Sequence, residues 1–121
     1  MSRLSVIAIV DDDEAVRDAL FDLLQVEGLS ARIFEGAAPF LAACGDFDCV
    51  ITDVRMPEID GIELQRRLRA GGSAMPVIYV TSCDEDVLRT RALQGGATGW
   101  FTKPVDDEAL LDTLKAVLPR C

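Results

Sequence analysis

Five polar residues stand at the ends of short apolar runs, and they carry the chemistry that this sequence can support. In chain order they are Asp11, Asp12, Asp53, Thr81 and Lys103. If the runs are parallel strands, their carboxyl ends meet at one edge of a sheet, where ligands of such sheets bind. A solvated surface loop is the ordinary explanation for a single Asp. It does not account for all five residues, and packing of a core does not require them.

Three carboxylates, a hydroxyl and an ammonium group at one edge predict a site for a cation and a phosphoryl group. Crowded carboxylates take up protons unless a cation compensates their charge. An all-oxygen set suits Mg²⁺ or Mn²⁺ rather than zinc. A carboxylate beside such an ion can act as a nucleophile and form an aspartyl phosphate. Lys103 can then neutralise phosphoryl oxygens, and Thr81 can donate a hydrogen bond to them.

The elements that must position these residues follow from hydrophobic periodicity. Five apolar runs alternate with five helical patterns, and each helical segment is long enough for a right-handed crossover between parallel strands. The first and fourth runs are almost continuously apolar, as in strands covered on both faces, whereas the second alternates weakly and suits an edge. We therefore expect an α/β fold with a single (βα)5 doubly wound parallel sheet. Its strands are expected at 4–10, 29–34, 48–53, 77–82 and 99–102.

Two of the expected helices have a clear apolar stripe. In the first, Val16, Leu20 and Leu24 recur at helical spacing, and Gly28 occupies the position of a C-terminal cap. Leucines repeat in the same way over 110–118. The remaining helices, expected at 36–44, 61–70 and 84–94, are shorter. The last of these has the sparsest apolar face, which predicts low local stability.

The composition indicates one small acidic domain, expected over residues 1–121. Half of the residues are hydrophobic, enough for a core without disulfides or metals. Twelve basic and 21 acidic residues give a net charge of −9, which argues against direct nucleic-acid binding by this chain. The chain has no His. Ser-His-Asp catalysis, His-ligated metals and the role of histidine donor in a relay are therefore excluded.

Cysteine usage and apolar run lengths favour a cytoplasmic protein without a membrane segment. The four cysteines, Cys44, Cys49, Cys83 and Cys121, form neither a C-x-x-C pair nor a zinc spacing, which favours free thiols in a reducing compartment. The longest apolar run, 6–10, is far too short to span a bilayer, and no signal-peptide pattern follows it.

Four segments together resemble the receiver domain of bacterial two-component response regulators. They are IVDDDEAVR (9–17), VITDVRMPEIDGIEL (50–64), VIYVTS (77–82) and GWFTKPVDDEALL (99–111). The resemblance covers nearly the whole chain in order and spacing. TDVRMP and TKPVDDEALL are most similar to the nitrogen-fixation-regulator (FixJ-like) group. The resemblance implies a flavodoxin-like strand order of 2-1-3-4-5.

The resemblance also implies roles for the polar residues. Asp53 corresponds to the phosphoryl acceptor and is also a metal ligand. Asp12 corresponds to a direct Mg²⁺ ligand, Asp11 to the residue that holds metal-bound water, and Arg55 to the residue whose backbone carbonyl completes the metal shell. Mn²⁺ is expected to substitute for Mg²⁺.

The remaining positions match the family's phosphoryl-binding and switch residues. Thr81 and Lys103 would bind the phosphoryl oxygens, and the Lys103–Pro104 peptide is expected to be cis. Thr81 and Trp100 would form the switch, with Trp in place of the family's usual Tyr or Phe. Gly61 matches a turn glycine. Asp13 is better explained as a charge at a helix N-terminus than as a ligand.

The resemblance implies a phosphorelay switch rather than a conventional enzyme. A sensor histidine kinase or phosphotransfer protein would phosphorylate Asp53, and the chain would catalyse only its own phosphoryl uptake and autodephosphorylation. The surface formed by 84–94, 99–102 and the last helix would then change, controlling an output domain or partner involved in transcription. A homodimer through 84–94 and 99–102 in the phosphorylated state is a further expectation.

Four other functions can be compared with the residues of this sequence. A pseudo-receiver that acts only through protein contacts is the main alternative, although the chain retains all five polar residues. A flavodoxin-like electron carrier needs an uncharged phosphate loop where this chain has Asp11–Glu14. A D-x-D phosphatase needs a second Asp where Arg55 stands. A nucleotide-binding domain needs a G-x-x-x-x-G-K-[ST] loop, which is absent.

Overall fold

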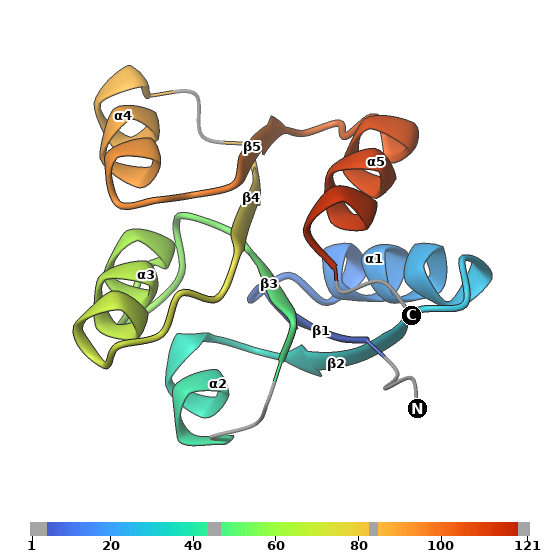
Figure 1. The fold of residues 1–121 in the computed structure, drawn as a ribbon, viewed down its shortest axis with the longest axis horizontal. Helices are drawn as coiled ribbons and strands as arrows, with labels where there is room; N and C mark the ends of the chain where they lie inside the picture. Colours follow the sequence, from blue (N-terminus) through green and yellow to red (C-terminus); the bar gives the residue numbers. More distant parts are fainter. Residues whose placement is uncertain (1–4, 44–46, 83–84, 119–121) are drawn as a thin grey trace.

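The computed structural model describes residues 5–43, 47–82 and 85–118, and within them a parallel sheet of order β2-β1-β3-β4-β5 (Figure 1). This arrangement confirms the expected doubly wound α/β fold and its strand order. Expected element ends at Leu4, Cys44 and Asp84 lie outside the described residues. The strands are β1 (Val6–Val10), β2 (Ser30–Phe34), β3 (Cys49–Thr52), β4 (Val77–Thr81) and β5 (Gly99–Thr102).

A helix follows each strand, and the helices cover both faces of the sheet. In Figure 1, α1 and α5 lie on one side of the strands, and α2, α3 and α4 lie on the other. No helix in the described part of the chain is long and apolar enough to cross a membrane. The helices are α1 (Glu14–Val26), α2 (Ala37–Ala43), α3 (Gly61–Ala70), α4 (Asp86–Gln94) and α5 (Asp107–Val117).

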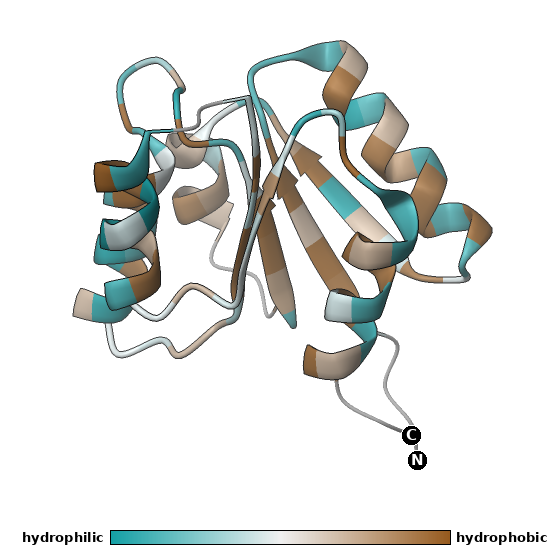
Figure 2. Cartoon of the chain, turned by 90° about the horizontal axis from the view of Figure 1, so that it is seen from above, coloured by the Kyte–Doolittle hydropathy of each residue, from teal (hydrophilic) through white to brown (hydrophobic). Residues whose placement is uncertain are grey.

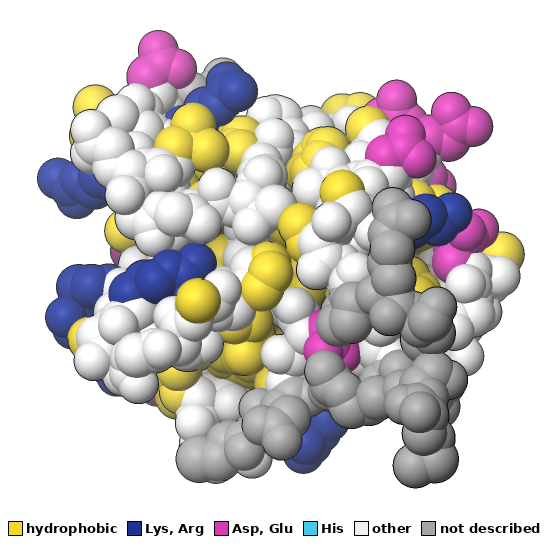
Figure 3. Space-filling view, in the orientation of Figure 1, with side chains coloured by type: hydrophobic (Ala, Val, Ile, Leu, Met, Phe, Trp, Pro, Cys, Tyr) yellow, Lys and Arg dark blue, Asp and Glu magenta, His cyan; other side chains and the backbone are white. Residues whose placement is uncertain are grey.

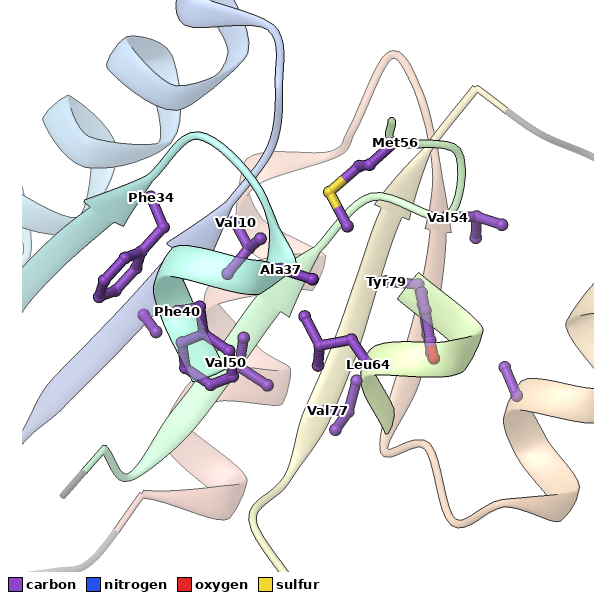
Figure 4. Close-up of a cluster of buried hydrophobic side chains, with 12 residues drawn as sticks. Val10, Phe34, Ala37, Phe40, Val50, Val54, Met56, Leu64, Val77 and Tyr79 are labelled. Atoms are coloured by element: carbon purple, nitrogen blue, oxygen red, sulfur yellow. The ribbon is translucent and has the colours of Figure 1, made fainter. Parts of the chain in front are cut away.

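Each face of the sheet has its own hydrophobic core because side chains alternate along a strand. In β1, Ile7 and Ile9 pack with α1 and α5, whereas Ala8 and Val10 pack with the helices of the other face. Most of the strand residues are accordingly coloured as hydrophobic in Figure 2, with a hydrophilic segment in one strand. The core beneath α2 and α3, drawn in Figure 4, also contains Tyr79 from β4.

Acidic side chains cap α1, α3 and α5, which begin near the carboxyl edge of the sheet. Asp13 accepts hydrogen bonds from the backbone N–H groups of Ala15 and Val16 at 2.9 and 3.4 Å. This confirms that Asp13 is a helix-capping residue. Asp60 and Asp106 accept equivalent bonds at the starts of α3 and α5. These caps fix where the loops after the strands end.

The α4 helix is the least buried helix, as its sparse apolar pattern predicts. Among its residues, all of which the structure describes, only Ala92 is buried. Val87 and Leu93 are 64% and 48% exposed. Glu85 occupies the N-cap position but makes no side-chain capping bond. Little apolar area therefore holds α4 against the rest of the fold.

The β2 strand forms one edge of the sheet, as its weak alternation indicates. Its Arg32 and Ile33 are exposed, whereas Phe34 is buried. The guanidinium carbon of Arg32 lies 5.1 Å from the centroid of the Phe34 ring, within the range of a cation–π contact. A charged side chain therefore lies across the end of this edge strand.

Cys49 in β3 is a buried free thiol, consistent with the expected reduced state. Burial raises the pKa of this thiol to about 12, and the nearby charge of Asp48 adds to the shift. Cys49 is therefore unreactive at neutral pH. Cys44, Cys83 and Cys121 lie outside the described residues.

Candidate functional site

The structure brings the three predicted carboxylates together at the carboxyl edge of the sheet. Pairing of Val10 with Thr52 places the residues that follow them, Asp11 and Asp53, at the ends of neighbouring strands. Asp11, Asp12 and Asp53 each offer an oxygen atom, and these atoms lie within 4.8 Å of one another. Asp11 is buried, Asp53 is half-buried and Asp12 is exposed, so the cluster is open to solvent on one side.

Lys103 joins this cluster from the loop after β5. Its Nζ atom lies 3.4 Å from Asp11 Oδ2 and 3.3 Å from Asp53 Oδ2. Its backbone N–H donates to the carbonyl oxygen of Thr81 at 2.8 Å, which anchors the loop to the neighbouring strand. The Lys103–Pro104 peptide is cis, as expected. One ammonium group thus faces two carboxylates.

Hydrogen bonds fix the orientation of the two less exposed carboxylates, those of Asp11 and Asp53. Asp53 Oδ1 accepts the backbone N–H of Val54 at 2.6 Å, which leaves Oδ2 facing Lys103. Asp11 Oδ1 accepts the N–H of Asp13 at 2.9 Å. Burial raises the pKa of Asp11 and the charge of Asp53 adds to this, while the Asp13 N–H and Lys103 oppose the shift. A cation at this edge would favour the ionised form.

The donor set fits a hard divalent cation. All three side chains present carboxylate oxygens, and the described part of the cluster contains no thiolate, which matches the preference of Mg²⁺ for oxygen and retained water. The exposed side of the cluster leaves room for water or a phosphoryl group.

Thr81 and Trp100 lie on the two strands next to this cluster. Thr81 is buried at the carboxyl end of β4, beside Thr102 of β5. Trp100 pairs with Tyr79 in the same register, and their ring centroids are 5.3 Å apart with a 38° tilt. Trp100 is half-buried and packs against the core beneath α3. The two expected switch residues therefore lie on adjacent strands.

The Arg55 side chain has an ion-pair partner outside the carboxylate cluster. It is exposed and forms an ion pair with Glu85, the residue before α4. The sequence offers Glu58 or the acidic pocket as its ion-pair partner, so the partner shown here differs from both. Arg55 thus connects the loop after β3 to the start of α4.

Two further residues, Gly61 and Tyr79, lie next to the site. A Cβ atom at Gly61 would collide with the carbonyl oxygen of Asp53, so glycine is required where α3 passes this loop. The Gly61 N–H donates to Val54 O at 2.8 Å. Tyr79, whose hydroxyl lies 3.0 Å from the Gly61 carbonyl, was not predicted. Its sequence signal is the hydroxyl group that it places among the aliphatic residues of β4 before Thr81.

The fold is a doubly wound parallel sheet with three carboxylates and a lysine at its carboxyl edge. These features define a class of α/β domains suited to binding a cation and a phosphoryl group. Residues 7–115 match the family model described as the response regulator receiver domain. The chain therefore belongs to the response regulator receiver domain family.

Relatives and solved structures agree with this family. The chain is 41% identical to the response regulator protein TodT of Pseudomonas putida, over 96% of this chain and 52% of TodT. It is also 41% identical to the transcriptional regulatory protein FixJ of Azorhizobium caulinodans, over 93% of this chain and 54% of FixJ. This confirms the resemblance to the FixJ-like group. The chain spans about half the length of these relatives.

Among solved structures, the fold is similar to the chemotaxis protein CheY4 of Vibrio cholerae. The TM-score is 0.87 at 29% identity, covering 96% of this chain and all of that one. The whole of that chemotaxis protein therefore matches the fold of nearly the whole of this chain.

Proposed function

We propose that Asp53 accepts a phosphoryl group from the phosphohistidine of a sensor histidine kinase or phosphotransfer protein. The observation that carries this proposal is the meeting of three carboxylates and Lys103 at one edge, in a chain of the receiver family. A new P–O bond to Asp53 forms as the P–N bond to the donor histidine breaks, and the histidine leaves as imidazole. The chain itself has no His, so the donor belongs to the partner.

Each residue of the edge has a distinct role in this proposal. Asp11, Asp12 and Asp53 would hold Mg²⁺ together with the backbone carbonyl of Arg55, and Mn²⁺ would substitute for it. The ion supplies charge neutralisation for the transferring phosphoryl group. Lys103 is already placed against Asp53 and neutralises a phosphoryl oxygen. Positioning and charge stabilisation account for the catalysis, so the chain acts only on its own phosphoryl uptake and hydrolysis.

Phosphorylation then favours a second conformation of the domain. Thr81 donates its hydroxyl hydrogen to the phosphoryl group, and the side chain of Trp100 moves in response. The surface of α4, β5 and α5 changes, and a second copy or an output partner binds to it. Because TodT and FixJ are about twice as long as this chain, we propose that residues 1–121 are the receiver part of a cytoplasmic regulator of transcription.

Intact-mass measurement after incubation with acetyl phosphate and Mg²⁺ tests the proposal. Wild type should gain one phosphoryl group, and Asp53→Asn should gain none. Excess EDTA should abolish the gain in wild type. If wild type takes up no phosphoryl group with Mg²⁺ present, the chain is a pseudo-receiver that acts through protein contacts alone.

Trp fluorescence tests the coupling of the edge to the switch. Trp100 is the single Trp of the chain, so the signal has one source. In wild type we expect the fluorescence to change on addition of Mg²⁺ and to change further with beryllofluoride, a phosphoryl mimic. In Asp53→Asn we expect neither the further fluorescence change nor phosphoryl uptake. A response to Mg²⁺ without a response to beryllofluoride would contradict coupling to Trp100.

A further inference from the structure

A buried path of two hydrogen bonds joins β4 to α4 through α3. The Tyr79 hydroxyl donates to the side-chain oxygen of Gln65, and Gln65 Nε2 donates to the carbonyl oxygen of Ala92 at 3.1 Å. Tyr79, Gln65 and Ala92 are 0%, 2% and 0% exposed. Because all three are buried, water does not readily replace either bond, and the two bonds strengthen each other.

The single hydroxyl hydrogen of Tyr79 has two acceptors within reach, Gln65 Oε1 and the Gly61 carbonyl oxygen. The Gln65 amide nitrogen faces the carbonyl of Ala92, so the Gln65 oxygen faces Tyr79 and needs a donor. Gln65 Oε1 is also the nearer acceptor. We therefore assign the hydrogen to Gln65. Burial raises the pKa of the phenol, which keeps Tyr79 a donor at neutral pH.

The ring of Tyr79 lies against Trp100 and also approaches Gly61, which is bonded to the loop that carries Asp53. One face lies against Trp100, with the centroids 5.3 Å apart. Its Cε1 atom approaches Gly61 so closely that a Cβ there would lie 3.0 Å away. Gly61 is bonded in turn to Val54, the residue after Asp53. Tyr79 thus contacts the phosphoacceptor loop and the aromatic switch residue at once.

The Gln65 bond reaches α4 at the point where that helix is best held. Ala92 is the one buried residue of α4, whose residues the structure describes throughout. Arg69 Nε also donates to the Gly95 carbonyl at 3.2 Å, just after the helix. At the other end, Glu85 is held by an exposed ion pair with Arg55. The carboxyl-terminal end of α4 is therefore anchored to α3, and Gln65 is the buried part of that anchor.

We propose that Tyr79 and Gln65 are positioning residues that hold α4 and transmit the movement of Trp100 to it. A shift of the Trp100 ring displaces the Tyr79 ring, the hydroxyl leaves Gln65, and the carboxamide loses the orientation that holds Ala92. Helix α4 is then released from α3. This inference deepens the proposed function and rests on it for the event that moves Trp100.

Hydrogen exchange of the α4 amides in the unmodified protein tests the connection itself. Tyr79→Phe removes only the hydroxyl, and Gln65→Met removes both bonds while keeping the length of the side chain. We expect each change to speed α4 exchange about tenfold, and the double variant to exchange no faster than the faster single variant. Gln94→Met, at an exposed position of α4, is the matched control and should leave exchange unchanged.

Effects that add in the double variant, or unchanged α4 exchange in both single variants, would overturn the connection. If Tyr79→Phe does not fold, the comparison of α4 exchange in Gln65→Met with that in Gln94→Met still tests the connection. Unchanged exchange in Gln65→Met would overturn the proposal. Circular dichroism establishes which variants are folded.

Hydrogen exchange of the α4 amides in the presence of Mg²⁺ and beryllofluoride tests whether the movement of Trp100 is transmitted to α4. In wild type, the Trp100 fluorescence and α4 exchange should both change. In Tyr79→Phe and Gln65→Met, the fluorescence response and phosphoryl uptake should stay within about twofold, while the further change in α4 exchange is lost. An α4 response that persists in both variants overturns transmission. If wild type does not take up a phosphoryl group, the proposed function is overturned instead. The comparison of α4 exchange in the unmodified wild type and variants still tests the connection from Tyr79 through Gln65 to α4.

Discussion

Lys103 carries the positive charge that faces two carboxylates of the edge, and its removal should slow phosphoryl uptake. In Lys103→Met, the charge that neutralises the phosphoryl oxygens is lost, so we expect uptake from acetyl phosphate to slow about 10²-fold. Time courses by intact mass measure this. Lys115→Met is the control, because Lys115 pairs with Glu27 at 3.2 Å, on a different part of the surface. Equal rates in Lys103→Met and wild type would contradict the role.

Gly61→Ala should disturb the loop of Asp53 as well as the stability of the fold. The added methyl group meets the Asp53 carbonyl and the Tyr79 ring, and such overpacking costs about 1–3 kcal/mol. Urea unfolding measures the loss. Gly36→Ala is the matched control, since a Cβ there has no neighbour within 4 Å. If the free energy of unfolding falls no more than in Gly36→Ala, the loop that carries Asp53 accommodates the methyl group without strain.

The sequence predicts which residues meet at the edge but not all of their partners. Asp11, Asp53 and Lys103 could be placed together because each follows a strand of one parallel sheet. The Arg55–Glu85 ion pair could not be predicted, because it joins two loops that come together only in the folded chain. The same holds for Tyr79 and Gln65, whose contact depends on the packing of α3 against β4.

Within α3, Glu63 should make stability depend on pH in the acid range. Hydrogen bonds from Arg66 and Arg67 lower the pKa of Glu63 to about 2 from 4.5. The folded state thus favours the ionised carboxylate, so this contribution is present above about pH 4.5 and is lost as the pH falls towards 2. We expect Glu63→Gln to lose less stability than wild type between about pH 6 and pH 3.

Urea unfolding across that pH range provides the measurement. Glu108→Gln, in the first turn of α5, serves as the matched control for the loss of one helix carboxylate. Identical slopes in Glu63→Gln and wild type would show that the two arginines do not favour the ionised form in solution.

The elements themselves were largely predictable, because their boundaries follow from local signals. The leucine stripe before Gly28 predicts α1, and the arginines Arg89 and Arg91 in a short apolar pattern predict that α4 is poorly buried. How α4 is held could not be inferred, since its anchors Gln65 and Arg69 belong to another helix.

Across the whole molecule, charge is unevenly distributed over the two sides of the sheet. Helices α3 and α4 carry five arginines against two acidic residues, whereas α1 and α5 carry six acidic residues against two basic ones. Figure 3 shows basic side chains over α3 and α4 and acidic side chains over α5. Together with the carboxylate cluster, this places much of the net charge of −9 near the carboxyl edge and the α1–α5 side.

This distribution should repel a small anionic donor. At saturating Mg²⁺, uptake from acetyl phosphate should therefore become a few-fold faster as added salt screens the field between roughly 0.02 and 0.2 M. Intact-mass time courses at several potassium chloride concentrations measure this, with the Mg²⁺ concentration held constant. A rate that falls with salt would contradict net repulsion at the edge.

The edge strand β2 has a consequence for how copies of this domain behave when concentrated. Its outer backbone groups could pair with a strand of another molecule, but the Arg32 side chain, stacked on Phe34, keeps a charge beside them. Every approaching copy brings the same charge to the same place. Arg32 should thus discourage the growth of the sheet from one molecule to the next at high concentration.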